Sequence, residues 1–581
     1  MVAKEVLDFQ KLISYEYFPA ELPKCFNTNK IAENKDIAKL LDNSEQNAKI
    51  SLPYFYTGYK NIYSRRQFAI PNFFHYALAV NCISKHSKEI IAITSKDNKS
   101  LTAPLNKIPT GEVTYCKKSN RILDTKFEIE KLYLNNKYCI RLDITAFFSS
   151  IYTHSIAWAM HGKVKAKANK NDKSLLGNEL DLVIRNMNGT ETNGILTGNA
   201  ISRIVSEIIL SAVDESICKR LSELKIKANF LRYVDDYYIF TKDYTSIEAI
   251  IEIFRRKLED YHLSLNESKV KITESPFMFD NEWLIEMGNI SLNSDLILNK
   301  AIILYKKYKN IKIFKYALRK MRYCKTENFE ALGSRLLNLW SKFPVLSEQI
   351  LIILSQINVK DTYLKSTIYS LIDNCTRLNL QEELVWVAFA IKEFSVKISS
   401  PYQCKILKSK NDLAIIIILD LLESNQLKRT NQTTNELNNL KEYLLTLNNE
   451  KEVNDIENNE GDKLGNDNNQ KKEKKNNKSN RALWREHWLL IYECVSYNWL
   501  NLKDEIDCFI TKENERFFFE LNKGNLHFYD REYKLSSEIA KKKIKNESSQ
   551  DDNEEQKKEH TDKDTDDLKN KDGYFFFFFD Y

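Results

Sequence analysis

The chain has 581 residues, enough for two to four domains at roughly 150 residues each. Its 87 basic and 80 acidic residues leave a net charge of +7, so the composition permits a nucleic-acid partner without requiring one. The ten cysteines form no CxxC pair and no Cys/His spacing suited to zinc, and no charged-then-apolar leader opens MVAKEVLDFQ, so we expect a reduced, intracellular protein.

Residues 1–295 mix short strand-like runs with helical patterns, which predicts an α+β domain. We expect strands at residues 138–144 (YCIRLDI) and 230–240 (FLRYVDDYYIF), because β-branched and aromatic residues are frequent in both runs. Helices are expected at residues 200–221 and 246–263. In the first helix, apolar side chains recur at helical spacing at Ile201, Ile204, Val205, Ile208, Ile209 and Ala212.

Residues 296–427 lose the strand pattern and carry successive amphipathic segments, so they are predicted to begin an α-helical C-terminal domain. The apolar run LAIIIILDLL, residues 413–422, includes Asp420. It is also much shorter than the roughly 20 apolar residues that span a bilayer. We therefore expect a core helix at this place and no membrane segment.

Residues 428–480 are dominated by Asn, Lys, Glu and Asp, which predicts a disordered insert with at most a short helix at LKEYLLTL. Residues 481–535 are expected to complete the helical domain by packing on its first part, because neither segment alone buries its apolar face. Residues 536–581 form a charged tail, expected to be flexible, which ends in DGYFFFFFDY.

Two adjacent acids, Asp235 and Asp236, stand in the apolar run LRYVDDYYIF, where acidic residues are disfavoured. A tight hairpin with the acids at its tip explains them if a divalent ion such as Mg²⁺ offsets the repulsion between the carboxylates. Asp143 ends another strand-like run and is expected to face the same tip. Three carboxylates from two strands form the kind of site at which two metal ions drive nucleotidyl transfer. A solvent-exposed Asp-Asp turn is the structural alternative.

The order and spacing of these segments resemble the reverse transcriptases over roughly residues 55–290. RLDITAFFSSIY resembles motif A, NGILTGNAISRIVSE motif B, YVDD motif C and LNESKVKI motif D, while RRQFAIP resembles the fingers segment. Three finer features resemble the bacterial abortive-infection and defence-associated (Abi-like, DRT-type) reverse transcriptases. They are the segment SIYTHSIAWAMHGK, the form of motif B and the late segment HWLLIYE. The resemblance implies a right-hand polymerase domain of fingers and palm, followed by an α-helical, HEAT-like repeat domain.

The resemblance implies a role for each acid and for a nearby ring. Asp143, Asp235 and Asp236 would bind two Mg²⁺ ions, with Mn²⁺ as a substitute. Asp236 is the weakest of the three assignments, because the second acid of this hairpin often stabilises geometry instead of binding. Phe148 would be the steric gate that leaves no room for a ribose 2′ hydroxyl. Either Phe147 or Phe148 must belong to the core.

Further matches concern the nucleotide and the template. Arg66, or Arg65 beside it, would clamp the triphosphate through its planar guanidinium, and a solvated surface arginine is the alternative. Gly194 and Gly198 would allow close backbone approach to the incoming base and the template, or serve only as turn glycines. Lys269 would protonate the pyrophosphate, or is a solvated lysine near a helix end.

Motif B departs from the Pro-Gln-Gly-Ser-Pro that most templated reverse transcriptases carry, because this chain has Leu-Thr-Gly-Asn-Ala at residues 196–200. The glutamine that helps to position template and nucleotide is therefore missing. Template use is expected to be limited to a particular RNA, such as a dedicated non-coding RNA, or to be dispensable.

Together these features predict an RNA-directed or template-independent DNA polymerase, a DNA nucleotidyltransferase that uses deoxynucleoside triphosphates (dNTPs) and binds RNA, DNA or both. By resemblance, it acts in antiphage defence in the bacterial cytoplasm, without a membrane partner, and its helical surface allows a homo-oligomer. The aromatic end of the tail is expected to dock on the helical domain or on a neighbouring subunit, or else Tyr581 or Tyr574 would prime synthesis in the way that relatives attach DNA to tyrosine. The alternative is a nucleic-acid-binding scaffold on an inactive polymerase fold.

Overall fold

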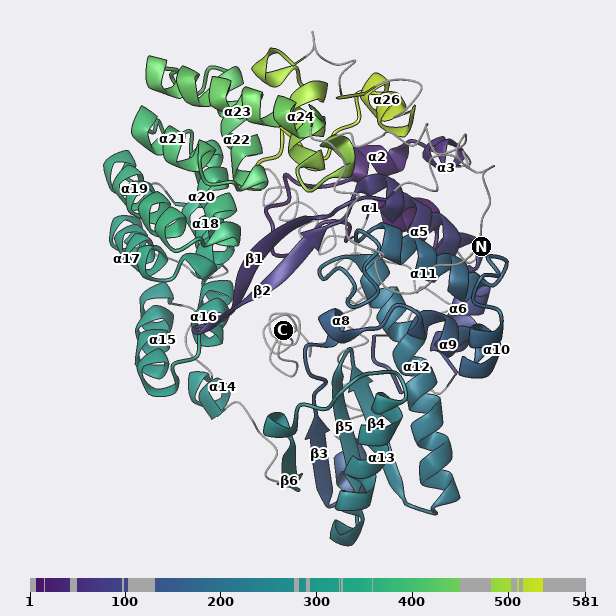
Figure 1. Cartoon of the computed structure of the whole chain (residues 1–581). Coiled ribbons are helices and arrows are strands. Elements are labelled where there is room, and N and C mark those ends of the chain that lie inside the picture. Colours follow the sequence, from purple (N-terminus) through teal and green to yellow (C-terminus); the bar gives the residue numbers. More distant parts are fainter. Residues whose placement is uncertain are drawn as a thin grey trace, which may run out of the picture.

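A computed structural model shows a mixed helix-and-sheet half followed by a helical half (Figure 1). This arrangement confirms the predicted fold class. The tail that carries Tyr574 and Tyr581, and residues 450–480 of the predicted insert, lie outside the described residues. The structure describes residues 7–14, 16–41, 50–96, 99–102, 131–275, 282–288, 293–322, 324, 328–357, 359–449, 482–502, 509–510 and 516–536.

A four-stranded antiparallel sheet with the order β4-β5-β3-β6 lies at the lower end of the molecule in Figure 1. Its strands are β3 (Tyr138–Leu142), β4 (Ala228–Tyr233), β5 (Asp236–Thr241) and β6 (Lys271–Glu274). One face packs on helix α13 (Ile247–Glu259), whose Phe254 contacts Phe230 and Tyr237 with ring centroids 5.2 Å apart. The aromatic residues that favour strands here also supply the packing, which fixes the sheet on its helices.

Helix α12 (Ala200–Glu223) is the central helix of the first half and packs against α5, α6, α9 and α13. Asn199 caps it, because the Asn199 side chain accepts a hydrogen bond from the Ser202 amide at 3.0 Å. The helices predicted at residues 200–221 and 246–263 are therefore confirmed as α12 and α13. The remaining helices of this half are α5 (Phe73–Lys85), α6 (Ser87–Thr94), α8 (Phe147–Ser150), α9 (Ser155–His161), α10 (Lys163–Ala168) and α11 (Leu176–Asn186).

The second half is a helical array in which most helices pack on the next one and on the next but one. The inner row is α16 (Lys312–Met321), α18 (Ser347–Leu354), α20 (Gln381–Glu393), α22 (Asp412–Glu423) and α24 (Trp488–Ser496). The outer row is α17 (Phe329–Lys342), α19 (Asp361–Arg377), α21 (Ser400–Leu407) and α23 (Asn431–Asn449), with α14 (Glu282–Met287) and α15 (Ser294–Tyr308) at the start of the array. Such stacking of helix pairs is typical of α-solenoids.

The structure tests two sequence predictions about this half, one of a core helix and one of disorder. Every residue from 412 to 422 in α22 is buried, which confirms a core helix at LAIIIILDLL. The prediction of disorder from residue 428 was wrong at its start, because α23 is a long helix that packs on α21. Leu437, Leu444 and Leu447 recur at helical spacing and are buried, which stabilises a helix despite its many asparagines.

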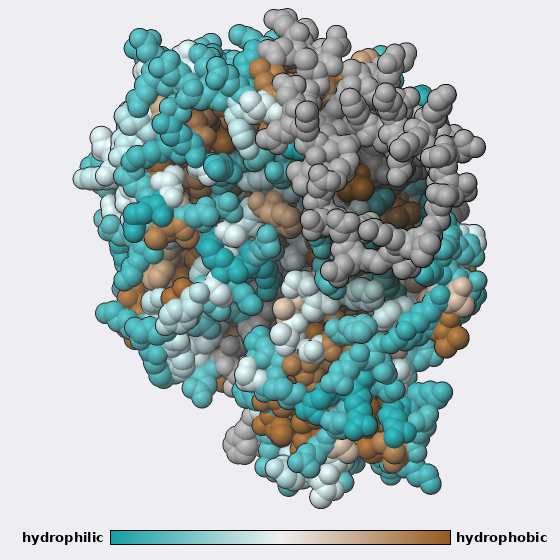
Figure 2. Space-filling model, viewed as in Figure 1, coloured by the Kyte–Doolittle hydropathy of each residue, from teal (hydrophilic) through white to brown (hydrophobic). Residues whose placement is uncertain are grey.

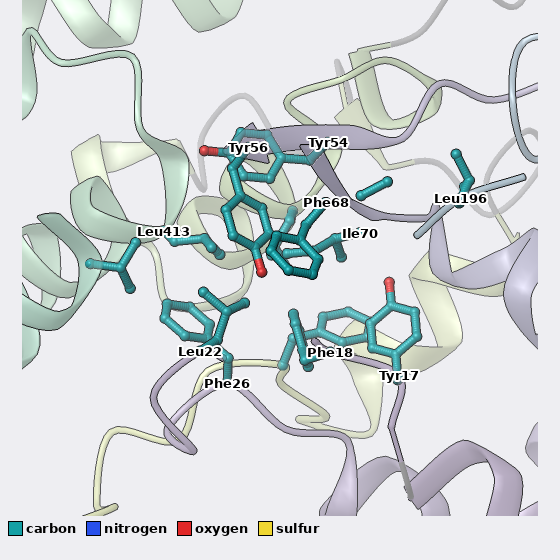
Figure 3. Packing of buried hydrophobic residues seen from close by; sticks show 14 of the residues in the cluster. Tyr17, Phe18, Leu22, Phe26, Tyr54, Tyr56, Phe68, Ile70, Leu196 and Leu413 are labelled. Atoms are coloured by element: carbon teal, nitrogen blue, oxygen red, sulfur yellow. The ribbon is translucent and has the colours of Figure 1, made fainter. Parts of the chain in front are cut away.

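The two halves share one continuous hydrophobic core instead of meeting at a separate boundary. The hairpin of β1 (Tyr54–Asn61) and β2 (Ser64–Ile70) lies between them in Figure 1. Figure 3 shows Tyr56 and Phe68 of this hairpin beside Phe18 and Phe26 of the N-terminal segment and Leu413 of α22. The N-terminal helices are α1 (Phe9–Ser14), α2 (Asn29–Glu33) and α3 (Ile37–Leu40).

The C-terminal segment also packs into this shared core, against the N-terminal segment. Tyr529, after helix α26 (Arg516–Lys523), forms a bridge with Phe26, and the amide of Asn27 donates to the Phe528 carbonyl at 2.9 Å. α24 packs on α22, as expected for a helical domain completed by its second segment. Residues about 500 positions apart in sequence thus form one structural unit (Figure 1).

The described surface shows no large apolar face in the view of Figure 2, where hydrophobic residues are scattered among hydrophilic ones. Among the helices of the described residues, none combines the length and apolar character that crossing a bilayer requires.

Candidate active site

The sequence predicted both acids at the tip of a hairpin, and the β4–β5 hairpin has Asp235 in its turn and Asp236 as the first residue of β5. Tyr233 pairs with Asp236, which leaves Val234 and Asp235 as a two-residue turn. Leu142 of β3 pairs with Tyr237 of β5, so Asp143, one residue further, comes level with Asp236. The register therefore brings all three carboxyl groups to the same end of two neighbouring strands.

Asp143 is half-buried and is held by residues of the segment before β6. Its carboxylate lies 3.1 Å from the Lys269 ammonium and accepts a hydrogen bond of 3.1 Å from the Asn266 side chain. The Asn266 amide also donates to the Asp143 carbonyl at 2.8 Å. Lys269 is therefore adjacent to the candidate site, where a proton donor to a leaving group would have to be.

Asp236 and Asp235 have different environments although they are adjacent. Asp236 is buried, and its carboxylate lies 3.6 Å from the Arg141 guanidinium, which also stacks over the Tyr238 ring. Asp235 is half-buried in the turn. The more accessible pair is thus Asp143 and Asp235, while Asp236 is committed to an ion pair.

The donor set fits a hard divalent cation, because carboxylate oxygens are the ligands that Mg²⁺ prefers. Within the described residues, however, no group of three His, Cys, Asp or Glu side chains is already arranged around one point. Lys269 and Arg141 balance the charge of the acids instead. Both printed contacts of the Asp143 carboxylate, from Lys269 and Asn266, reach the same oxygen, Oδ2.

The two phenylalanines after Asp143 are also placed differently. Phe147 is buried in the core, whereas Phe148 is half-buried and its carbonyl accepts a hydrogen bond from the Ile195 amide at 2.8 Å. Phe147 is thus the core residue of the pair. The role of Phe148 as a gate for the sugar stays a prediction.

Gly194 and Gly198 both have positive φ, at 87° and 109°, where a side chain is disfavoured. A Cβ atom at Gly194 would lie 3.1 Å from the Ser149 carbonyl, and one at Gly198 would lie 2.7 Å from the Pro19 ring. The close approach that these glycines allow is therefore to the protein itself. The positive φ angles and the close protein contacts explain both glycines without the expected approach of a base or a template.

Arg65 has a structural contact that the sequence did not reveal. Its guanidinium forms an ion pair of 2.6 Å with Glu383, at the start of α20, and donates to the Thr57 carbonyl at 3.0 Å. If Arg65 clamped the triphosphate, its ion pair with Glu383 would have to break. The structure therefore argues against Arg65 as the alternative clamp. Arg66 lies on the opposite face of β2, across from Gly58, and remains the candidate.

The start of α20 also covers the free edge of β1. The Gln381 side chain accepts a hydrogen bond from the Thr57 amide at 2.7 Å, and Glu382 accepts one from the Tyr59 amide at 3.0 Å. Burial, with the nearby acids Glu383 and Glu21, raises the pKa of Glu382 to about 8. The helical half therefore holds the hairpin that carries Arg66.

This pKa predicts a pH dependence of stability. The unfolded chain releases the Glu382 proton at the ordinary pKa of 4.5, whereas the folded chain keeps it up to about pH 8. The stability that the bound proton contributes therefore decreases as the pH rises above 4.5 and is lost once the pH has passed about 8. From pH 6 to pH 9, the free energy of unfolding should fall by roughly 2 kcal/mol more in the wild type than in Glu382→Gln. Urea unfolding at both pH values measures the difference, and equal falls would contradict the prediction.

The sequence interpretation missed a buried charge network beneath the hairpin, formed by Arg232, Glu207, Asp214 and Tyr237. Arg232 lies 2.9 Å from Asp214 and 3.2 Å from Glu207, and the Tyr237 hydroxyl donates to Asp214 at 2.8 Å. Burial raises the pKa of Asp214 and of Tyr237. A signal was present in the sequence, because Glu207 and Asp214 are seven residues apart on one helix face, among apolar residues. Those neighbours are the buried residues Ile204, Leu210 and Ile217.

Comparison with known proteins places this site in a recognised domain. Residues 78–336 match the family described as "Reverse transcriptase (RNA-dependent DNA polymerase)". Asp143 and the hairpin acids lie inside the matched range. No curated protein matches the chain. The chain therefore contains a reverse transcriptase domain.

Solved structures of telomerase are also similar. Apo telomerase from Candida tropicalis truncated from its C-terminal domain is 16% identical over 39% of this chain and 51% of that one, with a TM-score of 0.28. Apo telomerase from the same organism is 12% identical over 66% and 74%, with a TM-score of 0.29. Telomerase from Candida albicans in complex with a fragment of telomeric RNA is 11% identical over 62% and 66%, with a TM-score of 0.27.

The alignment spans about half the length of the first of these structures. At these TM-scores, neither the fold nor any activity or partner of this chain is inferred from the similarity.

Proposed function

We propose that this protein extends DNA from dNTPs by two-metal nucleotidyl transfer, copying RNA or adding nucleotides without a template, in bacterial antiphage defence. The observation that supports the chemistry is the convergence of Asp143 with Asp235 and Asp236 at one end of β3 and β5, within the reverse transcriptase domain. Defence, a cytoplasmic location and a dedicated RNA template are proposed from the sequence resemblance.

Two Mg²⁺ ions, or Mn²⁺ in their place, would activate the attacking 3′ hydroxyl and neutralise the departing pyrophosphate. Asp143 and Asp235 are the residues that would hold them, because both are half-buried and share one end of the sheet. Asp236, paired with Arg141, would keep the hairpin in place. Lys269, released from Asp143, would donate a proton to the leaving group.

The test is incorporation of labelled dNTPs by the purified full-length chain with Mg²⁺. The substrates are poly(rA) with an oligo(dT) primer, the RNA that copurifies with the protein, and no template. Product with RNA only would indicate RNA-directed synthesis, and product without template would indicate the alternative. Wild-type protein that is folded yet as inactive as Asp235→Asn under all three conditions would contradict the proposal and favour a binding scaffold.

The sugar gate gives a separate prediction. Phe148→Ala should increase incorporation of ribonucleotides relative to deoxynucleotides by about tenfold to a hundredfold, because bulk alone excludes the 2′ hydroxyl. Competition between a ribonucleotide and the matching dNTP measures the ratio. Phe329→Ala is the control, because Phe329 is exposed on α17 and its loss should leave the ratio unchanged. An unchanged ratio in an active Phe148→Ala protein would contradict the assignment.

Protein priming is proposed for Tyr581 or Tyr574 from the resemblance, with nucleic-acid priming as the alternative. Label from dNTPs that stays with the denatured protein after nuclease treatment would indicate a covalent attachment. Its loss in Tyr581→Phe, in Tyr574→Phe or only in the double variant would identify the primer. Label that persists in all three would place the attachment at another residue.

The defence role is tested by the plating efficiency of phages on bacteria that express the chain. Wild-type protein should reduce plating by at least one phage, and Asp235→Asn at the same protein level should not. Equal plating on both strains across a broad phage panel would contradict this role. Light scattering of the purified protein would show whether it forms the homo-oligomer that the resemblance allows.

A further inference from the structure

Arg232, at the end of β4, is completely buried although it carries a charge. Its guanidinium is satisfied by Asp214 and Glu207 of α12, at 2.9 Å and 3.2 Å. A buried ion pair of this kind often contributes little net stability, because removing two charges from water costs about as much as their attraction returns. The network therefore calls for an explanation beyond stability.

One further contact of Arg232 goes to the acidic turn itself. The same Nη1 atom that reaches Glu207 also donates to the Val234 carbonyl at 2.9 Å. Val234 is the residue directly before Asp235. The guanidinium thus joins the helix α12, which is buried on most sides, to the tip of the hairpin that carries the acids.

The turn needs such a support because its backbone is strained. Val234 has φ of 53°, in the left-handed region that β-branched residues rarely adopt. A residue held there costs about 1–3 kcal/mol and persists only when its surroundings impose the conformation. The turn residues that favour this geometry are Gly, Asn and Asp, so valine does not favour the turn by itself.

The geometry points to Arg232 as a positioning residue for the candidate active site. We propose that its guanidinium, held by Glu207 and Asp214, imposes the left-handed conformation of Val234 through the Val234 carbonyl and so directs Asp235 towards Asp143. This inference rests on the proposed function, in which Asp143 and Asp235 hold metal ions. It assigns to three charged residues outside the acidic motif a role in metal binding.

Two variants separate positioning from folding. Arg232→Lys keeps a buried positive charge beside Glu207 and Asp214, but an ammonium lacks the planar fork that serves both acids and the Val234 carbonyl at once. The triple variant Glu207→Gln/Asp214→Asn/Arg232→Met removes all three charges together, so that no unpaired charge remains in the core. Neither variant alters Asp143, Asp235 or Asp236.

The chain offers a matched control at Asp420. This buried carboxylate accepts a hydrogen bond from Arg531 at 2.6 Å and one from the Tyr529 hydroxyl at 2.8 Å. Asp214 has the same kinds of partner, an arginine Nε and a tyrosine hydroxyl. Asp420→Asn therefore reports the general cost of disturbing a buried charge network outside the reverse transcriptase domain.

Three measurements are made on folded full-length protein. Hydrogen exchange of peptides from residues 230–240 reports the turn, titration with Mn²⁺ by electron paramagnetic resonance reports metal binding, and dTTP incorporation on poly(rA) with oligo(dT) reports catalysis. We expect faster exchange and weaker Mn²⁺ binding in both Arg232 variants. We also expect kcat to fall by roughly 10- to 100-fold, with the KM for dTTP little changed. Asp420→Asn should match the wild type in all three.

Folded Arg232 variants with wild-type exchange, Mn²⁺ affinity and kcat would overturn the proposal. Equal changes in Asp420→Asn would also overturn it, because they would indicate a general loss of stability. If the wild type neither incorporates dTTP nor binds Mn²⁺, the proposed function fails, and hydrogen exchange alone then decides whether Arg232 holds the turn.

Discussion

Replacing Asp143 or Asp235 with asparagine is expected to reduce dNTP incorporation roughly a thousandfold or more, without loss of the fold. Asparagine keeps the size of the side chain but removes the charge that a metal ion requires. Because Asp143 and Asp235 are only half-buried, the structural cost of the change should be small. The rate of incorporation per folded molecule, with folding checked by circular dichroism, measures the effect.

Asp243→Asn is the control for this experiment. Asp243 lies after β5, at the opposite end of the strand from the hairpin tip, and is exposed. Its side chain accepts a hydrogen bond from the Thr245 amide, which asparagine can also accept. Activity should therefore stay at the wild-type level. Activity within tenfold of the wild type in Asp143→Asn or Asp235→Asn would exclude the proposed metal site.

Asp236 is expected to respond differently from its neighbour. Asp236→Asn should lower activity less than Asp235→Asn does, but destabilise the chain more, because it leaves Arg141 beside a buried neutral group. The sequence resemblance already makes Asp236 the weaker metal ligand of the two acids. The structure gives the physical reason, because Asp236 pairs with Tyr233 and so lies in the strand and not in the turn.

The sequence was informative wherever local pattern determines structure. Asp235 and Asp236 disrupt a strand-forming run, so a hairpin could be predicted from their neighbours, and Asp143 could be placed beside them once two strands were assumed. Phe147 and Phe148 were correctly expected to divide into a core residue and a more exposed one. These features depend on alternation along a strand or on a turn of a few residues.

Contacts between distant parts of the chain could not be predicted in this way. Arg65 and Glu383 are 318 residues apart, and no local pattern distinguishes Arg65 from Arg66. Gly198 leaves no room for a side chain, because a Cβ atom there would lie 2.7 Å from Pro19 and 3.1 Å from Phe68, which are distant in sequence. Val234 was counted as an ordinary strand residue, because its left-handed backbone depends on Arg232 and α12.

The joint between the N- and C-terminal segments gives the largest expected effect on stability. Phe528 is completely buried, and its ring lies 5.0 Å from Phe73, 5.3 Å from Trp488 and 5.3 Å from Tyr492, centroid to centroid. Phe528→Ala should lower the free energy of unfolding by about 3–5 kcal/mol, because it removes this packing and leaves a cavity. Urea unfolding followed by tryptophan fluorescence measures the loss.

Phe329→Ala is again the control and should change the free energy of unfolding by less than about 0.5 kcal/mol, because its ring is exposed. The reverse transcriptase domain should lose its activity in the same range of urea as the helical half unfolds, since Phe73 of α5 and Trp488 of α24 pack on the same ring. If activity survives to higher urea in Phe528→Ala than the helical signal does, the polymerase half folds independently. The shared core predicts instead that both are lost together, so that the C-terminal segment is a part of the structure that carries the active site.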